Sequence, residues 1–309
     1  MTANTLGIGD LARATGVPVR TIRFYCDSGV LEAVRSTGGH RRFPLGTVDQ
    51  LKLIRRLRGL GLGLPSIVEV LSGAQSLDEA VAAERKALDI EVAALAWRRA
   101  SLRAIEEASP ADRAARLDLL SAVQNGPAAR EALMDFWRRL FLAPLPEDTV
   151  GMFLEVSVPA LSADPTPTEV VAYAEMVTLL EDPVLRRQML ARTRFNTTQI
   201  ADEAALHAGV GEACLIALPL VAAGQSPAPG PALDHFVTTH AQARGEHDTP
   251  TFRRELLTLS ALDRTPRFRR YWHLVGTVTG EPVTVGETHT WLLDSLSADV
   301  QLSTAKFEG

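Results

Sequence analysis

The sequence predicts a mainly α-helical protein, in which a winged helix-turn-helix head is followed by a long dimerisation helix and an all-helical body. Three observations predict this order. Two short amphipathic segments flank Gly16, residues 77–108 contain neither Gly nor Pro, and apolar residues three and four apart fill most of the remainder. The chain has 309 residues and is 46% hydrophobic, so it can bury a substantial core. We expect boundaries at 1–73, 74–108 and 109–309.

The head begins with the pattern of a helix-turn-helix. Apolar residues between Ile8 and Val17 mark one face of a short helix, and Gly16 suits a tight turn because glycine accepts a positive φ. Pro18 fits the first turn of a second helix, on which Ile22 faces inward. The outward residues of that second helix are then free to enter a major groove.

A basic hairpin follows the second helix. Polar strands around Glu32–Ser36 and His40–Phe43 flank Thr37-Gly38-Gly39, and a Gly-Gly turn between short strands is typical of a hairpin. A basic hairpin beside a recognition helix is a wing. Pro44 is then expected to open a helix to about Leu60, and Leu64–Leu71 to form another. The residues expected to contact DNA are Arg20, Thr21, Arg23, Tyr25, Arg35, Gly39, His40, Arg41 and Arg42.

Several runs of this head resemble the MerR family of bacterial transcription regulators in order and spacing. Two residues depart from the pattern: Phe24 stands where a Tyr is frequent and has no hydroxyl to reach a phosphate, and Cys26 stands where an acidic residue is frequent. The resemblance covers roughly Leu6 to Leu71, and its matching runs are Arg20–Tyr25, Gly29–Leu31, Gly39–Phe43 and Leu60–Leu64.

The resemblance implies a homodimer bound to double-stranded promoter DNA together with RNA polymerase. Such regulators distort an overlong promoter spacer, often in response to an inducer. The charge distribution agrees with binding DNA at one end. Residues 1–73 carry ten basic and five acidic side chains, whereas the rest carries 22 basic and 32 acidic ones. A basic head on an acidic body fits a phosphate-binding end.

The long helix expected over Leu77–Ala108 carries an imperfect heptad seam. Polar Glu84, Glu91 and Arg98 interrupt it, so a long parallel coiled coil is only weakly indicated. A shorter antiparallel pairing, which the MerR resemblance implies, and a helix packed only on its own domain are the alternatives. The seam residues, our candidates for dimerisation, are Leu77, Val81, Leu88, Leu95, Leu102 and Ile105.

The body is expected to be helical from Asp112 onward. Thr166 or Thr168 is expected to cap a helix, Gly224–Pro231 to be flexible, and residues 277–285 to form either a small β-hairpin around Gly280 or a surface loop. Further helices are predicted at Val170–Leu180, Pro183–Arg194, Thr197–Ala223, Ala232–Ala243, Thr251–Leu262, Pro266–Val275 and Glu287–Leu296.

The residue inventory argues against several chemistries. The chain has only Cys26 and Cys214, so thiolate metal sensing, an iron–sulfur centre and a disulfide framework are not expected. The histidines have no zinc spacing, and Asp234, His235 and His240 do not share a helix face. No phosphate loop or nucleophile elbow is present. We therefore expect no metal, no cofactor and no enzymatic activity. Without an apolar run near 18 residues or a signal-like start, a cytoplasmic protein that binds no membrane is expected.

An acidic helical body with dispersed aromatics favours an effector domain that binds a small-molecule inducer, because ligand cavities are mostly apolar with a few polar groups. Two alternatives stay open: an architectural or ligand-independent regulator whose body binds another protein, and a DNA-tethered enzyme. The aromatic residues proposed to line the ligand site are Trp137, Phe141, Tyr173, Phe195, Trp272 and Trp291.

Overall fold

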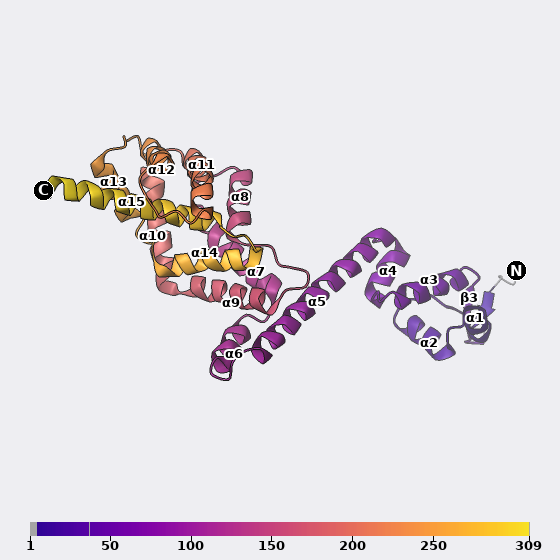
Figure 1. Ribbon diagram of the computed structural model, residues 1–309. Helices are drawn as coiled ribbons and strands as arrows, with labels where there is room; N and C mark the ends of the chain where they lie inside the picture. The colour runs from indigo at the N-terminus through magenta and orange to yellow at the C-terminus, as the bar shows by residue number, and fades with distance from the viewer. Residues whose placement is uncertain (1–4, 37, 309) are drawn as a thin grey trace. The chain divides into compact units, whose positions relative to one another are not determined.

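The protein folds as two compact units, residues 1–92 and 93–309 (Figure 1). The computed structural model describes residues 5–36 and 38–308, with the side chains of the last helix as far as Ser303. Helices dominate both units, and the one sheet among the described residues has three short strands. The mainly α-helical class predicted from the sequence is confirmed.

The first unit contains the expected helix-turn-helix and wing. Gly16 ends the first helix with φ +70°, a left-handed conformation that costs glycine little. Thr37, in the predicted wing turn, lies outside the described residues. The elements are β1 (Thr5–Gly7), α1 (Ile8–Thr15), α2 (Val19–Asp27), β2 (Val34–Arg35), β3 (Arg41–Pro44), α3 (Thr47–Gly59) and α4 (Leu64–Ser72).

The wing is a three-stranded sheet, because β1 adds to the predicted hairpin in the order β1-β3-β2. Leu6 pairs with Phe43, and Thr5 pairs with Pro44, both antiparallel. The expectation that Pro44 opens a helix is therefore wrong. Proline lacks an N–H but its fixed φ fits the extended end of a strand as well as a helix start, and α3 begins only at Thr47.

The core of the first unit joins every element of the head. Leu11, Ile22, Phe43 and Ile54 are each completely buried, and Ala80 from the following helix belongs to the same cluster. That following helix, α5 (Leu77–Glu106), is 30 residues long. Its start is capped reciprocally: the Glu79 N–H donates to the Ser76 hydroxyl at 3.2 Å, and the Ser76 N–H donates to the Glu79 carboxylate at 2.9 Å.

The second unit is an assembly of helices with two separate hydrophobic cores. The first core joins the end of α5 to α6–α10 and α14, where α9 and α14 pack side by side (Figure 1). The second core joins α11, α12, α13 and α15. The helices are α6 (Arg113–Ala122), α7 (Gly126–Arg138), α8 (Glu147–Ser157), α9 (Pro167–Glu181), α10 (Pro183–Gln199), α11 (Glu203–Ala222), α12 (Pro231–Gln242), α13 (Pro250–Leu259), α14 (Pro266–Thr279) and α15 (Val285–Glu308).

Capping residues decide where several of these helices begin. Thr166, one of the two residues expected to cap a helix, caps the start of α9 and forms a capping box with Glu169. The single helix predicted over Thr197–Ala223 is wrong, because the chain becomes extended at Ile200 and Asp202 caps a new helix, accepting from the Ala205 N–H at 2.8 Å. A polar capping side chain thus separates two helices within a continuous helical pattern.

The predicted alternative of a β-hairpin over residues 277–285 is also wrong. Thr277–Thr279 complete α14, and Gly280 ends that helix with φ +73°. Thr284 and Glu287 then cap the start of α15, the Glu287 N–H donating to the Thr284 hydroxyl at 3.1 Å. The β-branched residues of this segment suggested strands. They lie instead at the end of α14, which Gly280 terminates, and at the start of α15, which Thr284 and Glu287 cap.

One helix in the described part of the chain, α11, has the length and apolar composition of a membrane span, with a mean hydropathy of 1.7 over its most apolar window. Core helices of soluble proteins share this property, but they are mostly buried, whereas 17% of this window is buried. Ala213, Cys214 and Ala217 pack into the second core, whereas Leu215 and Ile216 are exposed.

Candidate nucleic-acid interface

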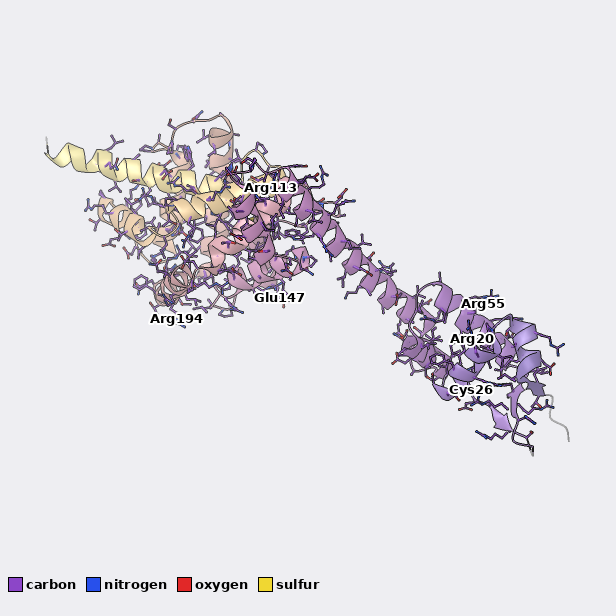
Figure 2. The ribbon with its side chains drawn as sticks, turned by 90° about the horizontal axis from the view of Figure 1, so that it is seen from below. Arg20, Cys26, Arg55, Arg113, Glu147 and Arg194 are labelled. Carbon is purple, nitrogen blue, oxygen red and sulfur yellow. The ribbon has the colours of Figure 1, made fainter. Side chains whose placement is uncertain are left out.

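The exposed face of α2 carries two arginines and an aromatic ring. Arg20, Arg23 and Phe24 are spaced three and four apart, so they share one helix face, and all three are exposed. Ile22 on the opposite face is completely buried and fixes the orientation of the helix. Figure 2 shows Arg20 on this helix, with Cys26 near its end. Thr21 and Tyr25 are half-buried beside this face.

The turn before α2 is held from two directions. The Thr15 hydroxyl donates to the Leu11 carbonyl at 2.7 Å, and the Gly16 N–H donates to the Ala12 carbonyl at 2.9 Å. From α3, Arg55 donates to the Thr15 carbonyl at 3.3 Å. These bonds fix the angle at which α2 leaves α1, and with it the direction of Arg20 and its neighbours.

The wing is anchored by one aromatic side chain and presents cations on its exposed surface. Phe43 is completely buried in the head core, while Arg42 beside it is exposed. Arg35 and His40 are exposed as well. Gly39 has φ +78°, and its N–H donates to the Ser36 carbonyl at 2.8 Å, closing the end of the hairpin.

Arg41 differs from the other wing cations because it is bonded to α2. Its guanidinium donates to the Asp27 carboxylate at 2.5 Å, and its side chain is only 28% exposed. Burial raises the pKa of the neighbouring Cys26 thiol, while Arg41 acts in the opposite direction. Sequence reasoning missed Asp27, because 14 residues separate it from Arg41 and no local pattern links them.

The remaining cations of this surface lack acidic partners. Within the part of the head that the structure describes, none of Arg20, Arg23, Arg35, His40 and Arg42 forms an ion pair, whereas Arg13, Arg41 and Lys52 do. Unpaired guanidinium groups on one helix face and an adjacent wing are free to bind phosphates and base edges.

The proposed dimerisation residues are largely exposed. Leu88, Leu95 and Leu102 are 48%, 57% and 60% exposed, and Leu77 and Val81 are exposed too, whereas Ile105 packs against the first core of the body. Sequence reasoning missed Val92, which lies one turn from Leu88 and is 61% exposed. Trp97, Ala100 and Ala104 on α5 are buried in the body core instead.

The aromatic residues proposed as a ligand site fall into different places. Trp137 and Trp272 lie together, with ring centroids 5.9 Å apart, and Phe141 reaches the same group through Phe153. Tyr173 packs in the first core against Trp97. Trp291 belongs to the second core, and Phe195 is 47% exposed. The structure therefore brings Trp137, Phe141 and Trp272 together but not the other three.

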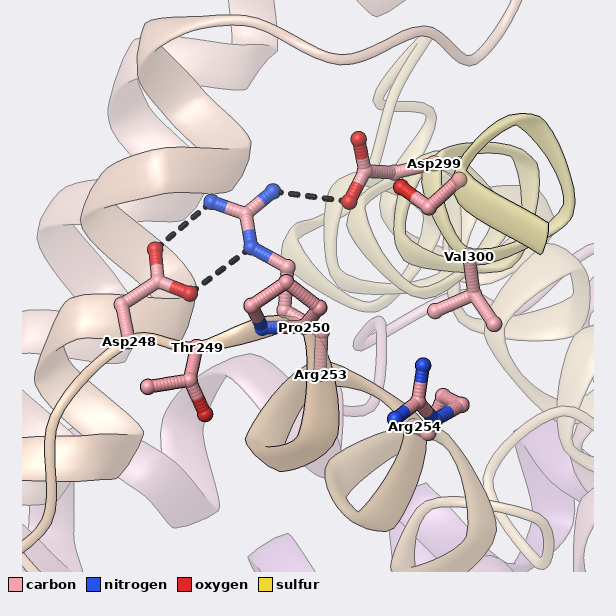
Figure 3. Close-up of a pocket in the computed structure, with 8 residues that line it drawn as sticks. Asp248, Thr249, Pro250, Arg253, Arg254, Asp299 and Val300 are labelled. Atoms are coloured by element: carbon pink, nitrogen blue, oxygen red, sulfur yellow. Dashed lines mark hydrogen bonds and ion pairs between the residues drawn. The ribbon is translucent and has the colours of Figure 1, made fainter. Parts of the chain in front are cut away.

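A hollow of about 300 Å³ lies elsewhere, between the start of α13 and the part of α15 around Asp299 (Figure 3). Its central Arg253 donates to Asp248, Asp299 and Asp234, and these carboxylates raise the pKa of the guanidinium. The arginine is thus already satisfied. In the described chain, no three His, Cys, Asp or Glu side chains gather as a metal site would require.

Two helices joined by a glycine turn, with a basic wing beside the second, define a winged helix-turn-helix domain of the kind that binds DNA. Residues 6–74 match the family described as MerR HTH family regulatory protein. The resemblance stated from the sequence is thereby confirmed.

The matching relatives are regulators and a nodulation protein. The nodulation protein NolA of Bradyrhizobium sp. (strain NC92) is 32% identical over 146 residues, covering 43% of this chain and 62% of its own. The HTH-type transcriptional regulator ZntR of Escherichia coli (strain K12) is 42% identical over 66 residues, 21% of this chain and 47% of its own. The mercuric resistance operon regulatory protein of Bacillus cereus is 40% identical over 74 residues, 24% of this chain and 55% of its own.

The chain spans less than two thirds of the length of these relatives, and each match leaves more than half of the chain uncovered. No solved structure matches it. The family match covers the head, and the 146-residue match to NolA is longer than the first unit. Most of the body has to be interpreted from its own residues.

Proposed function

We propose that this protein is a homodimeric transcription regulator that binds promoter DNA through its MerR-type head and responds to a small molecule bound by its helical body. The observation that carries the DNA-binding part is the set of unpaired, exposed cations on α2 and the wing, next to a buried anchor, Phe43. The name of the relative ZntR, an HTH-type transcriptional regulator, supports the same conclusion.

In this proposal α2 enters the major groove. Arg20 and Arg23 bind phosphates or guanine edges, and Phe24 lies against the apolar methyl group of a thymine. Thr21 and Tyr25 flank them. Arg35, His40 and Arg42 bind the backbone from the wing, where they give affinity without sequence information, and Gly39 lets the wing tip approach closely. Arg41 positions the wing through Asp27.

Dimerisation occurs in this proposal through the exposed seam of α5. Leu88, Val92 and Leu95 form a contiguous apolar stripe in the middle of the helix. Stacking this stripe against a second copy removes it from water, and two heads then read a pseudo-palindromic site. Distortion of the DNA spacer between the polymerase boxes costs on the order of 1–6 kcal/mol, an amount that ligand-dependent repositioning of two heads can supply.

A second function is favoured by one observation. Leu215, Ile216 and Leu218 on α11 are exposed, and an apolar surface of this kind also suits a body that binds another protein. The regulator would then act without a small ligand. In either case we place the protein in the cytoplasm, with DNA and RNA polymerase as partners.

Selection of DNA from a random-sequence pool by the full-length protein tests the proposal. We expect enrichment of a pseudo-palindromic sequence and a footprint on both half-sites. Arg23→Ala is expected to reduce that enrichment, while Arg113→Ala, a change at an exposed arginine on α6, leaves it unchanged. Failure to enrich any sequence, with a folded protein, contradicts DNA-specific regulation.

A further inference from the structure

A second hollow of the body, about 180 Å³, lies between α7 and α10. The residues of α7 that line it, among them Ala132, Phe136 and Arg139, are spaced three and four apart and so share one helix face. Arg186 and Leu190, one turn apart on α10, form the other wall. Both helices pack on α9 and contribute to the first core, so the two walls are held within one packed part of the body (Figure 1).

The buried positions of this lining are apolar. Phe136 is 7% exposed and belongs to the first core, and Leu140 packs against that core. Leu190 is half-buried on the opposite wall. Ala132 is exposed and carries only a methyl group, which leaves the space between the helices open. Such a hollow suits the apolar part of a ligand.

Arg186 is fixed in this hollow and has no carboxylate partner. Its Nε donates to the Leu180 carbonyl in the last turn of α9 at 2.7 Å, which holds the half-buried guanidinium in place. Asp182, one turn before Arg186, has the spacing of an ion-pair partner within a helix. However, Asp182 binds Arg267 and caps the start of α10. In the described part of the chain, the two Nη groups of Arg186 therefore remain available to an acceptor.

Arg139 adds a second cation to the same lining. It is exposed, and among the residues that the structure describes its side chain forms no ion pair. Asp135, one turn before Arg139, also lines the hollow but lies 3.8 Å from Arg138 instead. Two guanidinium groups and one carboxylate leave the lining with one net positive charge, so a ligand with a single negative charge balances it.

We propose that the hollow between α7 and α10 binds a small aliphatic monocarboxylate. Arg186 and Arg139 attract the carboxylate, and the chain lies against Phe136, Leu140 and Leu190. The lining follows α7 from Ala132 to Leu140, about 12 Å along the helix axis, and a small volume spread over that length fits a chain better than a ring system.

The inference rests on the proposed function, because it names the chemical class of the effector. A ligand that contacts both α7 and α10 stabilises one spacing of the two helices. It shifts the body between conformations by as much as its affinities for them differ.

Octanoate and octanamide are suitable probes, because they have the same chain and differ in charge. Isothermal titration calorimetry on the full-length protein is expected to show saturable octanoate binding and at least about tenfold weaker octanamide binding. Acetate, which lacks the chain, is also expected to bind at least about tenfold more weakly. Inorganic phosphate tests whether any oxyanion suffices. No saturable octanoate binding, or binding of octanamide, acetate or phosphate as tight as that of octanoate, overturns the proposal.

Two charge variants test the arginines. Arg186→Gln is expected to weaken octanoate binding about tenfold or more, and Arg139→Gln to weaken it about threefold or more, because each removes a charge-assisted donor. The matched control is Arg187→Gln, a change at an exposed arginine that follows Arg186 but does not line the hollow. Full affinity in Arg186→Gln, or an equal loss in Arg187→Gln, overturns the assignment.

A third variant tests the space itself. Ala132→Phe fills the hollow and leaves both arginines in place, and it is expected to weaken octanoate binding about tenfold or more. Ala191→Phe, at an exposed alanine of α10 outside the lining, is the control and is expected to bind normally. Melting temperatures show whether both variants fold; if Ala132→Phe does not, the arginine variants decide. Unchanged binding in a folded Ala132→Phe contradicts this location.

The same samples distinguish this inference from the proposed function. Binding of the wild type to selected DNA is measured by gel shift with and without octanoate. DNA binding without any octanoate binding leaves the regulator in place and removes this ligand class. Saturable octanoate binding that depends on Arg186, in a protein that selects no DNA, supports the site and contradicts the regulator.

Discussion

Arg41 on β3 and Asp27 at the end of α2 form an ion pair, with 2.5 Å between the guanidinium nitrogen and the carboxylate oxygen. The pair connects the wing to the recognition helix across 14 residues of sequence. Because both groups then move together, the spacing between α2 and the wing is set before DNA arrives. In the proposed interface, Arg41 therefore positions the wing, and we expect the unpaired Arg42 next to it to bind phosphate.

A double-mutant cycle tests this division of roles. Asp27→Ala and Arg41→Ala are each expected to weaken binding to selected DNA, and the double variant to lose less than the sum, with a coupling of about 0.5 kcal/mol or more. Arg42→Ala, by contrast, is expected to cost about 1–3 kcal/mol and to reduce the salt dependence of binding by about one phosphate contact. Additive effects of Asp27→Ala and Arg41→Ala in a fluorescence-anisotropy titration contradict the positioning role.

The recognition helix gives the second prediction. Arg23→Ala is expected to weaken specific binding by about 1–3 kcal/mol without lowering the melting temperature, since the side chain is exposed and forms no ion pair in the described chain. Arg113→Ala on α6 serves as the control of equal charge change (Figure 2). Anisotropy titrations at two salt concentrations separate loss of sequence preference from loss of charge. Unchanged affinity in Arg23→Ala removes α2 from the interface.

The head was predictable because its signals are local. Gly16 and Pro18 mark the turn, and Gly39 marks the wing, each through backbone geometry that few other residues allow. The strand β1 was not predicted, because it is only three residues long and exists through pairing with Phe43 and its neighbours. Short strands have no periodicity of their own to detect.

The body was predictable as helices but not as a site. Thr166 and Glu169 marked one helix start in the sequence, whereas Asp202, which separates α10 from α11, looked like part of a continuous helical pattern. The grouping of His207, His240 and His289 depends on which helices meet, since these three residues lie on α11, α12 and α15.

The third prediction concerns dimerisation by α5. Leu88→Glu and Leu95→Glu are each expected to convert the protein to a monomer that loses specific DNA binding, because a charge in an apolar interface is costly to desolvate. Ile90→Glu is the matched control: Ile90 is 53% exposed, close to the 48% of Leu88, but points to the opposite side of the helix. Sedimentation velocity at micromolar concentration gives the readout. A monomeric wild type, or dissociation by Ile90→Glu alone, contradicts the seam.

The fourth prediction concerns the contact between α14 and α15. A Cβ added at Gly286 would lie 1.7 Å from the Trp272 ring, so the indole packs directly on the backbone. Gly286→Ala is expected to destabilise the body by about 1–3 kcal/mol through overpacking. Gly151→Ala on α8, where nothing lies within 4 Å of the new methyl, is expected to be neutral or to stabilise by up to about 1 kcal/mol. Denaturant titration compares the two, and equal stability of both variants contradicts the close packing.

The last prediction follows from three half-buried histidines of the body. Burial lowers the pKa of His207, His240 and His289 below the ordinary value of about 6.5 that they regain on unfolding. When the pH falls below about 6.5, these histidines bind protons in the unfolded chain but not yet in the folded one. The free energy of unfolding therefore decreases as the pH falls from about 7 through 6. Arg192 and Arg244 face the cluster as cations and oppose protonation, while Asp263 favours it at His289.

Calorimetry at pH 7.5 and 5.5 is expected to show a lower melting temperature at pH 5.5. His240→Phe removes one titrating group and should reduce that difference, whereas His247→Gln, at an exposed position, should retain it. A melting temperature that is independent of pH, or equally dependent in both variants, would show that these rings do not titrate between the folded and unfolded states as their burial requires.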